Sequence, residues 1–330
     1  MKVALTGGTG CLGQPLMLLL KQNNFTLKLL LEPNDQRPLH VNGVEVVKGA
    51  INDEAAVDEL LKGAEVVFHL AGKVHDFSGT SETDKEFYQV NVEGTRLLLK
   101  MAKKNNVRRM VFYSTVGVYG QDSDFAGDEL SPCTPHTAYA QSKLAAEQEV
   151  LKAANNGGPE GVVLRFPVVY GPLDRGNIAN LIEAIYHKRF IFFGKGQNVR
   201  SMISAKNTAI AAYLASIQPQ ARGQVFLATD GDNYTLNTLI ETICAGLEMK
   251  WRPPRWPYFF GRFAGNIGDL FENITSRRMP FDSERLRKLF SSLTFSTAKI
   301  IQELGYKSQD TLEAGIKDEI AWLKTVKKWN

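Results

Sequence analysis

The chain has 330 residues, a formal net charge of +4 and 44% hydrophobic residues. These are the values of an ordinary globular protein with one large or two smaller domains, and they give no case for a nucleic-acid partner. Three scattered cysteines, Cys11, Cys133 and Cys244, show neither metal-ligand spacing nor a disulfide framework.

The start of the chain is strand-like, without the features of a signal peptide. The longest apolar run, Leu16 to Leu20, is far too short to cross a bilayer. Together with unpaired cysteines, which suit a reducing compartment, these features predict a cytoplasmic protein without a transmembrane segment or a metal site.

A glycine-rich turn follows the first predicted strand, Val3 to Leu5. It comprises residues 6 to 13, TGGTGCLG, and leads into a helical pattern. In this context Gly7 allows a tight turn, Gly10 lets the backbone approach a pyrophosphate at the helix N-terminus, and Gly13 lets the helix pack closely on the sheet. The turn therefore predicts a dinucleotide cofactor.

The second predicted strand, Thr26 to Leu31, ends at Glu32. A carboxylate there can accept hydrogen bonds from a ribose 2′-hydroxyl and repels a 2′-phosphate, which favours NAD over NADP. Arg37 is close enough in the sequence to keep NADP open, and a solvated glutamate at a strand end is the simpler alternative for Glu32.

Strands and helices continue to alternate through the first half. We expect strands at residues 44–47, 65–72 and 109–113, and helices at 53–61 and about 82–105. This alternation predicts a Rossmann-like, doubly wound parallel α/β sheet, whose ligands bind at the carboxyl ends of the strands. The residues expected at these ends are Gly7, Gly10, Glu32, Ala71, Gly72, Ser114 and Thr115.

Two histidines lie near the predicted cleft. His69 falls inside a buried-strand pattern, so we expect a structural role, whereas His75 follows in a loop and remains a candidate site residue.

Tyr139 and Lys143 are four positions apart in a predicted helix of about 137–154. This spacing places both side chains on one helix face, one turn apart. A free tyrosine titrates near pH ~10. A neighbouring ammonium favours the phenolate, so this pair could take and give a proton near neutral pH. An exposed tyrosine beside a solvated lysine is the simpler alternative for the motif taken alone.

Six segments come in the order and at the spacings of one known family. They are residues 6–13, 69–72 (HLAG), 91–95 (NVEGT), 114–120 (STVGVYG), 139–143 (YAQSK) and 165–172 (RFPVVYGP). Together they resemble the extended short-chain dehydrogenase/reductase superfamily in its NAD-dependent epimerase/dehydratase branch. The resemblance covers the first half of the chain densely.

The resemblance implies roles for the matching positions. Tyr139 would be the general acid/base, Lys143 would hold the nicotinamide ribose and lower the tyrosine pKa, and Thr115 would bind the substrate hydroxyl, with Ser114 able to share that role. Ala50 departs from the family, because many relatives carry there an aspartate that pairs with adenine. Cofactor contacts are implied for Gly7, Thr9, Gly10, Cys11, Leu12, Gly13, Glu32, Ile51, Asp53, Leu70, Ala71, Gly72, Asn91, Tyr139, Lys143, Pro167, Val168 and Val169.

Beyond Gly171 the pattern is looser, as expected of a segment that builds a substrate pocket. We expect helices at 178–186, 205–217 and 235–247, and strands at 191–193 and 224–227, the latter returning to the main sheet. The predicted Rossmann domain covers residues 1–170 with a return segment of about 199–230. A smaller C-terminal α/β substrate-binding lobe would cover 171–198 and 231–330.

The runs at 196–204, 224–232, 304–316 and 69–75 resemble nucleotide-sugar epimerases and 4-ketoreductases of bacterial surface-polysaccharide pathways. By that resemblance Arg200 would grip the diphosphate of a UDP-sugar, which suits the fork of an arginine. Asn177 and Asn180 would contact the nucleotide from a helix N-terminus, and Lys73 would approach cofactor or substrate phosphates. A surface arginine and a solvated loop lysine are the alternatives for Arg200 and Lys73.

Residues 251–290 combine tryptophan, proline and arginine. They could form a lid over the substrate, a peripheral contact with anionic lipid, or an amphipathic surface helix. This stretch, with residues 165–172, also resembles hydroxysteroid dehydrogenase/isomerase relatives.

We therefore predict NAD-dependent oxidation or reduction at C4 of a nucleotide-diphosphate sugar, by an epimerase or a 4-ketoreductase, with Tyr139 as general acid/base. One alternative is a 3β-hydroxysteroid-type or other small-alcohol dehydrogenase, which would not need Arg200. Another is a non-catalytic NAD(P)-binding sensor or scaffold, whose relatives usually lack the catalytic tyrosine or lysine. The helices at about 82–105 and 137–154 are those through which the family commonly forms a homodimer.

Overall fold

The computed structural model describes residues 1–74, 81–121, 123–257, 259 and 291–329. His75 and most of the 251–290 stretch lie outside the described residues. The strands are β1 (Lys2–Thr6), β2 (Thr26–Leu31), β3 (Val44–Lys48), β4 (Val66–His69), β5 (Arg109–Thr115), β6 (Phe125–Gly127), β7 (Glu160–Phe166), β8 (Val168–Tyr170), β9 (Phe192–Phe193), β10 (Val199–Ser204), β11 (Val225–Leu227), β12 (Asn233–Thr235), β13 (Arg255–Trp256) and β14 (Leu293–Phe295). The α-helices are α1 (Gly13–Gln22), α2 (Glu54–Leu61), α3 (Ser81–Tyr88), α4 (Gly94–Lys104), α5 (Ala138–Ala153), α6 (Asn177–Tyr186), α7 (Ala205–Ile217), α8 (Leu236–Gly246), α11 (Ala298–Leu304) and α12 (Leu312–Lys327).

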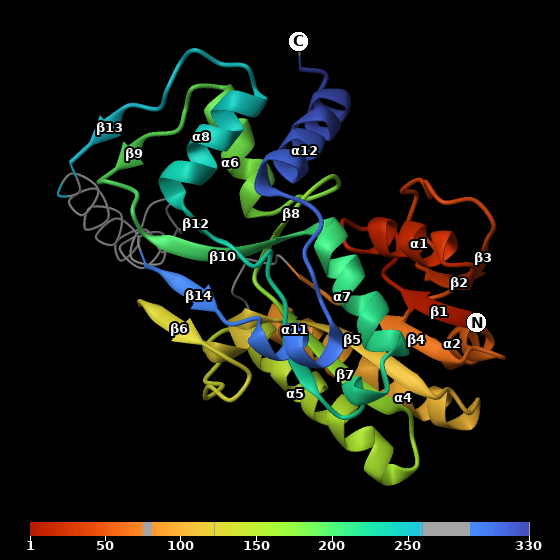
Figure 1. The fold of residues 1–330 in the computed structure, drawn as a ribbon. Coiled ribbons are helices and arrows are strands. Elements are labelled where there is room, and N and C mark those ends of the chain that lie inside the picture. The colour runs from red at the N-terminus through yellow and green to blue at the C-terminus, as the bar shows by residue number, and fades with distance from the viewer. Residues whose placement is uncertain (75–80, 122, 258, 260–290, 330) are drawn as a thin grey trace.

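The larger sheet has seven parallel strands in the order β11-β7-β5-β4-β1-β2-β3. Because successive strand side chains point to opposite faces, each strand contributes to two cores. Leu5 and Val111 pack with residues of α1 and α7, whereas Ala4 and Met110 pack with residues of α2, α4 and α5. Helices thus cover both faces of a parallel sheet (Figure 1), which explains the continuous apolar runs of its strands and confirms the predicted doubly wound α/β fold.

A second sheet connects this layer to the C-terminal lobe. It has the order β12-β10-β14-β6, and β8 pairs with β10 beside that path. Helices α6, α8 and α12 cover it with a core of their own. The strand predicted at 224–227 joins the main sheet as β11, beside β7. β10 lies in the second sheet instead, so only the α7–β11 part of the predicted 199–230 return segment reaches the Rossmann layer.

The single helix predicted at about 82–105 is wrong in one respect. A π-helical turn, Gln89–Glu93, separates α3 from α4. Such a turn inserts one extra residue per turn and occurs frequently at functional sites. Within the described residues, no helix is both long and apolar enough to cross a membrane.

Candidate active site

The glycine turn between β1 and α1 brings backbone segments so close together that side chains would not fit at two of its glycines. A Cβ on Gly7, whose φ is +77°, would lie 2.6 Å from the Ala71 amide nitrogen, and one on Gly13 would lie 2.3 Å from the Gly8 carbonyl oxygen. Beside Gly10 the nearest atoms are 3.9 Å away. Gly7 and Gly13 therefore close the turn, while a Cβ on Gly10 would meet only ordinary van der Waals contacts. Gly10 thus borders a cradle at the N-terminus of α1, where backbone amides favour a pyrophosphate.

An acid that the sequence analysis did not single out organises the rim of this cradle. Asp35 accepts a hydrogen bond from Thr9 Oγ1 at 2.7 Å and pairs with the Arg37 guanidinium at 2.6 Å. The hydrogen bond from Arg37 holds the pKa of the Asp35 carboxyl well below its usual range. Glu32 is exposed at the end of β2. Arg37 is thus held beside Gly10, and Asp35 compensates its charge. In the sequence, Arg37 was noticed because it lies shortly after Glu32, the acid at the end of a predicted strand.

Two other predicted cofactor residues have structural partners. The Asp53 carboxylate caps α2 by accepting hydrogen bonds from the amides of Ala55 and Ala56 at 3.0 and 3.1 Å. Ile51 is buried, and it packs against Gly94 at the start of α4. The Asp53 side chain therefore stabilises a helix N-terminus, and its predicted cofactor contact remains a prediction.

The predicted Thr115–Tyr139 pair comes together at the carboxyl end of β5. Thr137 starts α5 by accepting a hydrogen bond from the Ala140 amide at 3.2 Å, which sets Tyr139 in the first turn. Thr115, the last residue of β5, accepts from the Gly117 amide at 3.0 Å. The Thr115 side chain lies close enough to the Tyr139 phenol to lower the pKa of that phenol. The two hydroxyl side chains thus lie near each other at the carboxyl end of β5.

Lys143 lies one turn further along α5 and is buried. Its Nζ lies 4.2 Å from the centroid of the Phe112 ring. It is also 3.7 Å from the position that a Cβ on Gly72 would take, beside the end of β4. The ammonium thus reaches from the tyrosine helix toward the strand ends that border the glycine turn.

The expected lowering of the tyrosine pKa by Lys143 is not seen in this structure. Burial raises the pKa of Tyr139 to about 12, and the Thr115 side chain opposes that rise. Burial lowers the pKa of Lys143 to about 8, which Glu147 opposes. Desolvation disfavours the charged form of each group and is the largest cause of both shifts. At pH 7 the site holds a neutral tyrosine and a lysine that is still mostly protonated.

Ser114 does not share the substrate role expected for it. Its hydroxyl donates to Glu147 inside the protein. Glu147 forms a buried ion pair with Arg165 at 2.6 Å, and Arg165 donates to the Tyr119 hydroxyl at 2.9 Å. In the register of β5 and β7, Arg165 lies opposite Ser114. Ser114 therefore belongs to a buried network that supports β5, β7 and α5. The sequence did offer one signal for Glu147 as a neighbour of the site, because it follows Lys143 by four residues on the same helix face.

Asn91 occupies the π-helical turn and joins two parts of the site. Its Oδ1 accepts a hydrogen bond from the Lys73 amide at 2.7 Å, and its Nδ2 donates to Ser142 Oγ at 2.9 Å. Ser142 lies between Tyr139 and Lys143 in α5. Asn91 thus fixes the loop after β4 relative to the helix that carries the tyrosine and the lysine.

His69 is structural, as expected. One ring nitrogen lies 2.7 Å from Thr6 Oγ1 and the other lies 2.9 Å from Thr95 Oγ1. Thr95 in turn donates to the Asn91 carbonyl at 2.6 Å. Burial lowers the pKa of His69 to about 3, so the ring stays neutral.

The predicted nicotinamide-lining segment, Pro167 to Val169, crosses from the main sheet to the second sheet. Val168 pairs with Met202 of β10, two residues beyond Arg200. Arg200 itself is half-buried, and burial lowers its pKa. Arg200 therefore occupies a partly desolvated strand position in the sheet that also contains the nicotinamide-lining segment, and it is not a fully solvated surface residue.

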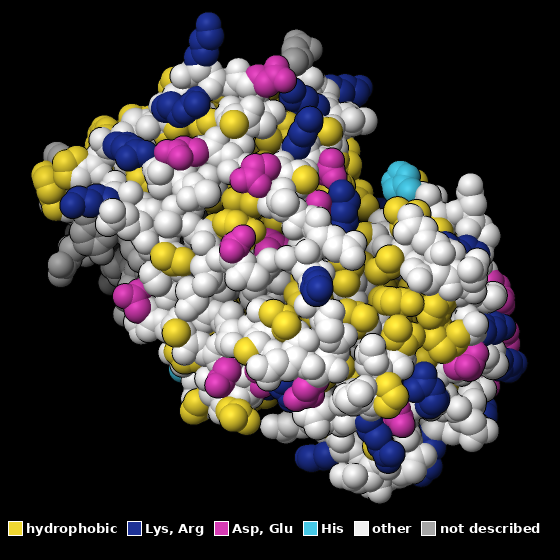
Figure 2. All heavy atoms as spheres, viewed as in Figure 1, with side chains coloured by type: hydrophobic (Ala, Val, Ile, Leu, Met, Phe, Trp, Pro, Cys, Tyr) yellow, Lys and Arg dark blue, Asp and Glu magenta, His cyan; other side chains and the backbone are white. Residues whose placement is uncertain are grey.

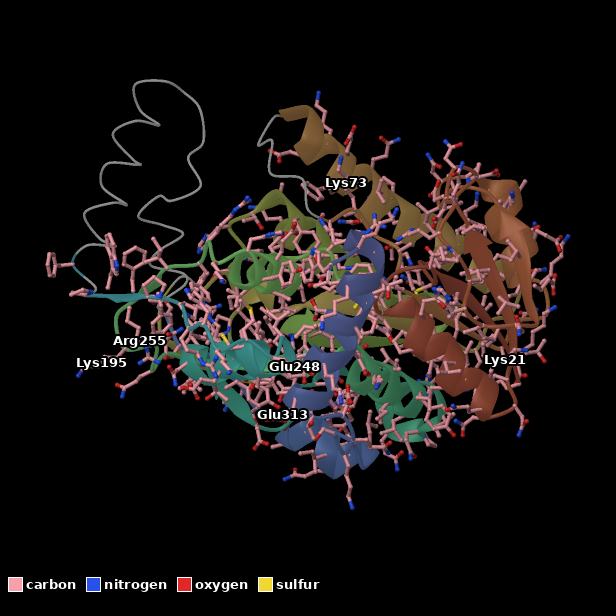
Figure 3. The ribbon with its side chains drawn as sticks, turned by 90° about the horizontal axis from the view of Figure 1, so that it is seen from above. Lys21, Lys73, Lys195, Glu248, Arg255 and Glu313 are labelled. Carbon is pink, nitrogen blue, oxygen red and sulfur yellow. The ribbon has the colours of Figure 1, made fainter. Side chains whose placement is uncertain are left out.

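The remaining predicted substrate residues lie at the surface. Asn177 and Asn180 are exposed on the first turn of α6. Lys73 is paired with Glu86 of α3, and its ammonium lies 5.8 Å from the Phe87 ring centroid. Figure 3 shows Lys73 beside α3, at the start of the loop that follows β4.

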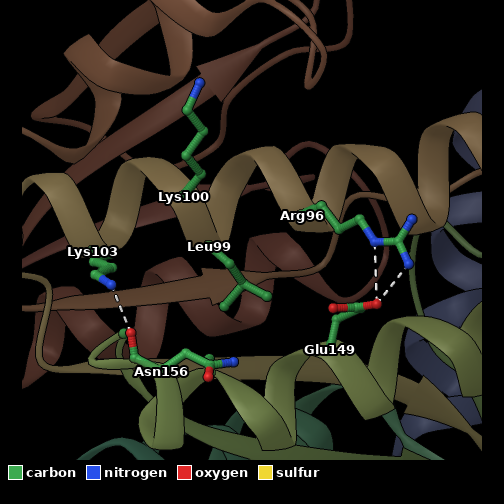
Figure 4. Close-up of a pocket in the computed structure, with 8 residues that line it drawn as sticks. Arg96, Leu99, Lys100, Lys103, Glu149 and Asn156 are labelled. Carbon is green, nitrogen blue, oxygen red and sulfur yellow. Dashed lines mark hydrogen bonds and ion pairs between the residues drawn. The ribbon is translucent and has the colours of Figure 1, made fainter.

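A separate surface pocket lies between α4 and α5 (Figure 4). There Arg96 pairs with Glu149 at 2.6 Å, and Lys103 donates to the Asn156 carbonyl at 2.7 Å. None of the predicted site residues lines it. These are the two helices expected to form a homodimer, which remains a prediction. Over the described ranges, no group of His, Cys, Asp and Glu side chains is arranged to hold a metal ion.

A doubly wound parallel sheet with a glycine cradle, and with Thr115, Tyr139 and Lys143 gathered at the same strand ends, defines a dinucleotide-dependent enzyme of the oxidoreductase type. The model of the NAD dependent epimerase/dehydratase family matches residues 3–228, and the chain belongs to that family. It is accordingly an NAD-dependent oxidoreductase or isomerase, which confirms the predicted family, cofactor and enzyme class.

Relatives match the chain over nearly its whole length. The chain is 30% identical over 317 residues to the N-acetyl-alpha-D-glucosaminyl-diphospho-ditrans,octacis-undecaprenol 4-epimerase of Escherichia coli O157:H7, covering 95% of this chain and 92% of that protein. It is 26% identical over 326 residues to the UDP-glucose 4-epimerase of Vibrio cholerae, covering 96% and 93%. The crystal structure of the UDP-glucuronic acid 4-epimerase from Bacillus cereus in complex with NAD has a TM-score of 0.78 at 18% identity, covering 99% of both chains. That last likeness shows a shared fold.

Proposed function

We propose that this protein oxidises and reduces C4 of a nucleotide-diphosphate sugar, as a 4-epimerase or a 4-ketoreductase. The observation that carries the proposal is the proximity of the Thr115 and Tyr139 side chains, with Lys143 one turn further along α5 and the glycine turn of Gly10 at the same edge of the sheet. Both reactions use the same residues, so this arrangement supports oxidation and reduction at C4. Whether the protein acts as an epimerase or as a ketoreductase then depends on the substrate that it receives.

The residues present fit a bound dinucleotide. The backbone of the glycine turn would hold its pyrophosphate, Lys143 its nicotinamide ribose, and residues 167–169 its nicotinamide. When bound, NAD supplies the acceptor and donor of hydride. This role requires close backbone approach at Gly10, and the 3.9 Å clearance there meets that requirement.

The chain's own residues then handle the proton. Thr115 holds the substrate oxygen, and Tyr139 gives its proton to that oxygen when a ketone is reduced and takes it back when the alcohol is oxidised. With the pKa of Tyr139 raised to about 12, the resting tyrosine is the proton-donating form. The oxidising direction needs the phenolate, which the nearby Lys143 ammonium favours. Asn91 keeps both helix and loop in register during this exchange.

Support for a diphosphate comes from Arg200 and from the relatives. Arg200 is a half-buried guanidinium in the sheet that links the two lobes, where a desolvated fork binds two phosphate oxygens well. All three proteins compared above are named as 4-epimerases, and each named substrate carries a sugar on a diphosphate. In the Escherichia coli relative the carrier is a polyprenol rather than a nucleoside, so a lipid-linked diphosphate sugar is the second candidate substrate.

Isothermal titration of the NAD-saturated protein with UDP and UDP-N-acetylglucosamine tests this proposal. We expect micromolar binding of both, and a large loss of affinity in Arg200→Ala but not in the exposed control Arg222→Ala. Binding of the sugar conjugate without binding of UDP would favour the lipid-linked candidate. Heat for neither ligand, with NAD still bound, would favour the hydroxysteroid-type or small-alcohol dehydrogenase.

A further inference from the structure

One end of the C-terminal lobe exposes large apolar side chains. β9 and β13 pair in parallel there, at the end of the molecule opposite β2 and β3 (Figure 1). Three of these side chains, Ile191, Trp256 and Phe259, are 40%, 47% and 62% exposed. The Trp256 ring packs edge-on against Phe193, with 6.4 Å between ring centroids. Apolar residues scattered singly on a surface need no explanation, but a cluster of this kind marks an interaction site.

Cations lie among these apolar residues. Lys195, Arg252 and Arg255 are exposed, and the Arg255 guanidinium lies 5.3 Å from the Phe192 ring centroid. Figure 3 shows Lys195 and Arg255 together at one end of the molecule, with Lys21 at the other. In the same region, Figure 2 shows hydrophobic and basic side chains side by side. We call the set Ile191, Phe193, Lys195, Arg255, Trp256 and Phe259 the β9–β13 surface.

The two segments that build the β9–β13 surface contain no acid. The sequence has no Asp or Glu between Glu183 and Asp230, and none between Glu248 and Asp269. Among the described residues beside this surface, Glu241 of α8 lines a pocket together with Arg252 and Arg255. The charged members of the β9–β13 surface, Lys195 and Arg255, are therefore both positive and both exposed.

We propose that the β9–β13 surface docks the enzyme on a bilayer that contains anionic phospholipid. Tryptophan is enriched at the headgroup level of membranes, and lysine and arginine there are attracted to anionic lipids. Exposed aromatic rings between cations, without acids among them, match a layer of phosphates over acyl chains. The proposal goes beyond the function proposed above, because docking requires neither NAD nor a sugar.

Vesicle sedimentation tests the charge component. The probes are vesicles of phosphatidylcholine with 30% phosphatidylglycerol, and vesicles of phosphatidylcholine alone, without substrate. Each cation near an anionic surface changes partitioning about fivefold, so Lys195→Glu/Arg255→Glu should weaken binding by at least about 25-fold. The control Lys21→Glu/Lys48→Glu makes the same change in net charge at the opposite end and should bind like the wild type. If the double variant fails to fold, Lys195→Glu alone, at an exposed position, should still weaken binding about fivefold or more.

Fluorescence tests the apolar component at a defined residue. Brominated lipid in the phosphatidylglycerol vesicles should quench tryptophan emission, and Trp256→Phe should remove most of this quenching although three other tryptophans remain. Equal binding to both kinds of vesicle, equal loss in the control double variant, or unchanged quenching in Trp256→Phe would each overturn the proposal. An equal loss in the control would mean that the net charge of the protein, and not the β9–β13 surface, governs vesicle binding. Failure of any arm leaves the C4 chemistry untouched, because UDP-sugar titration measures that separately.

Discussion

The substitution Gly10→Ala should separate cofactor binding from folding. Gly10 is not in the left-handed region, and the nearest atoms to an added Cβ lie 3.9 Å away. An alanine there meets neither backbone strain nor a clash in the protein, so its free energy of unfolding should stay within about 1 kcal/mol of the wild type. The added methyl group would occupy the cradle in which the backbone approaches the pyrophosphate.

The size of the effect follows from the hydrogen bonds at stake. Displacing the pyrophosphate from two backbone amides removes two hydrogen bonds to a charged group, at about 1.5 kcal/mol or more each. The dissociation constant for NAD should therefore rise by about 100-fold or more. The neighbouring substitutions behave differently: Gly7→Ala adds left-handed strain of about 1–2 kcal/mol, and both Gly7→Ala and Gly13→Ala bring a Cβ to within 2.6 Å of backbone atoms. Those two should lower the stability of the protein itself.

Thermal unfolding with and without NAD measures both the stability of the protein and its affinity for NAD. At an NAD concentration 100 times the wild-type dissociation constant, the cofactor stabilises the wild type by about 2.7 kcal/mol. Gly10→Ala should show a normal Tm without NAD and little rise when NAD is added. A Gly10→Ala protein whose Tm rises with NAD as much as that of the wild type would refute the placement of the pyrophosphate. A Gly10→Ala protein that is unfolded would refute the assignment of Gly10 to an open cradle.

Three further predictions concern Tyr139, Thr115 and the buried acid Glu319. Tyr139→Phe should lower kcat by about 10²–10⁴-fold while leaving NAD affinity unchanged, since it removes the proton carrier alone; turnover and NAD titration check this, and undiminished turnover would be inconsistent with the assignment. Thr115→Ala should lower kcat/KM much more than Ser114→Ala, because the Ser114 hydroxyl faces Glu147; equal losses would argue against that difference. Glu319 is buried and accepts from the Gly171 amide at 2.8 Å, and burial raises its pKa to about 9. The folded state thus binds this proton more tightly than the unfolded state, so stability should fall by up to about 1.4 kcal/mol per pH unit as pH rises from about 5 toward 9. Glu319→Gln should flatten that decline in denaturant titrations, and an unaltered slope would show that another group causes it.

The parts of the site that were predictable depend on local sequence. The glycine turn could be read because Gly7, Gly10 and Gly13 have fixed spacings between a strand and a helix. Tyr139 and Lys143 could be read because a helix brings residues four apart onto one face. Parallel strands buried on both faces leave continuous apolar runs, so the Rossmann layer was also visible in the sequence.

What was missed depends on partners distant in the sequence. Ser114 was expected near the substrate because it neighbours Thr115, yet strand alternation turns it toward Glu147 and Arg165. Asp35 gave no signal of its own, since its role comes from contacts with Thr9 and Arg37. The π-helical turn has no period that distinguishes it from the helices on either side.

The pKa of the tyrosine illustrates a different limit. The spacing of Tyr139 and Lys143 predicts the sign of their mutual effect, but it does not reveal how far each is removed from water. Burial reverses the expected shift in the structure and raises the pKa of Tyr139. The depth of a side chain depends on packing by residues such as Phe87 and Phe112, which come from other elements.

The most direct test of the C4 chemistry follows a label at that carbon. UDP-N-acetylglucosamine carrying deuterium at C4 is incubated with the protein and NAD, and mass spectrometry and NMR locate the label. The account predicts that deuterium leaves C4 and is recovered in the C4 epimer or in the reduced cofactor, and that Tyr139→Phe with NAD bound gives neither. Label that stays in unconverted substrate while both NAD and the sugar nucleotide are bound, or conversion that persists in Tyr139→Phe, would contradict it.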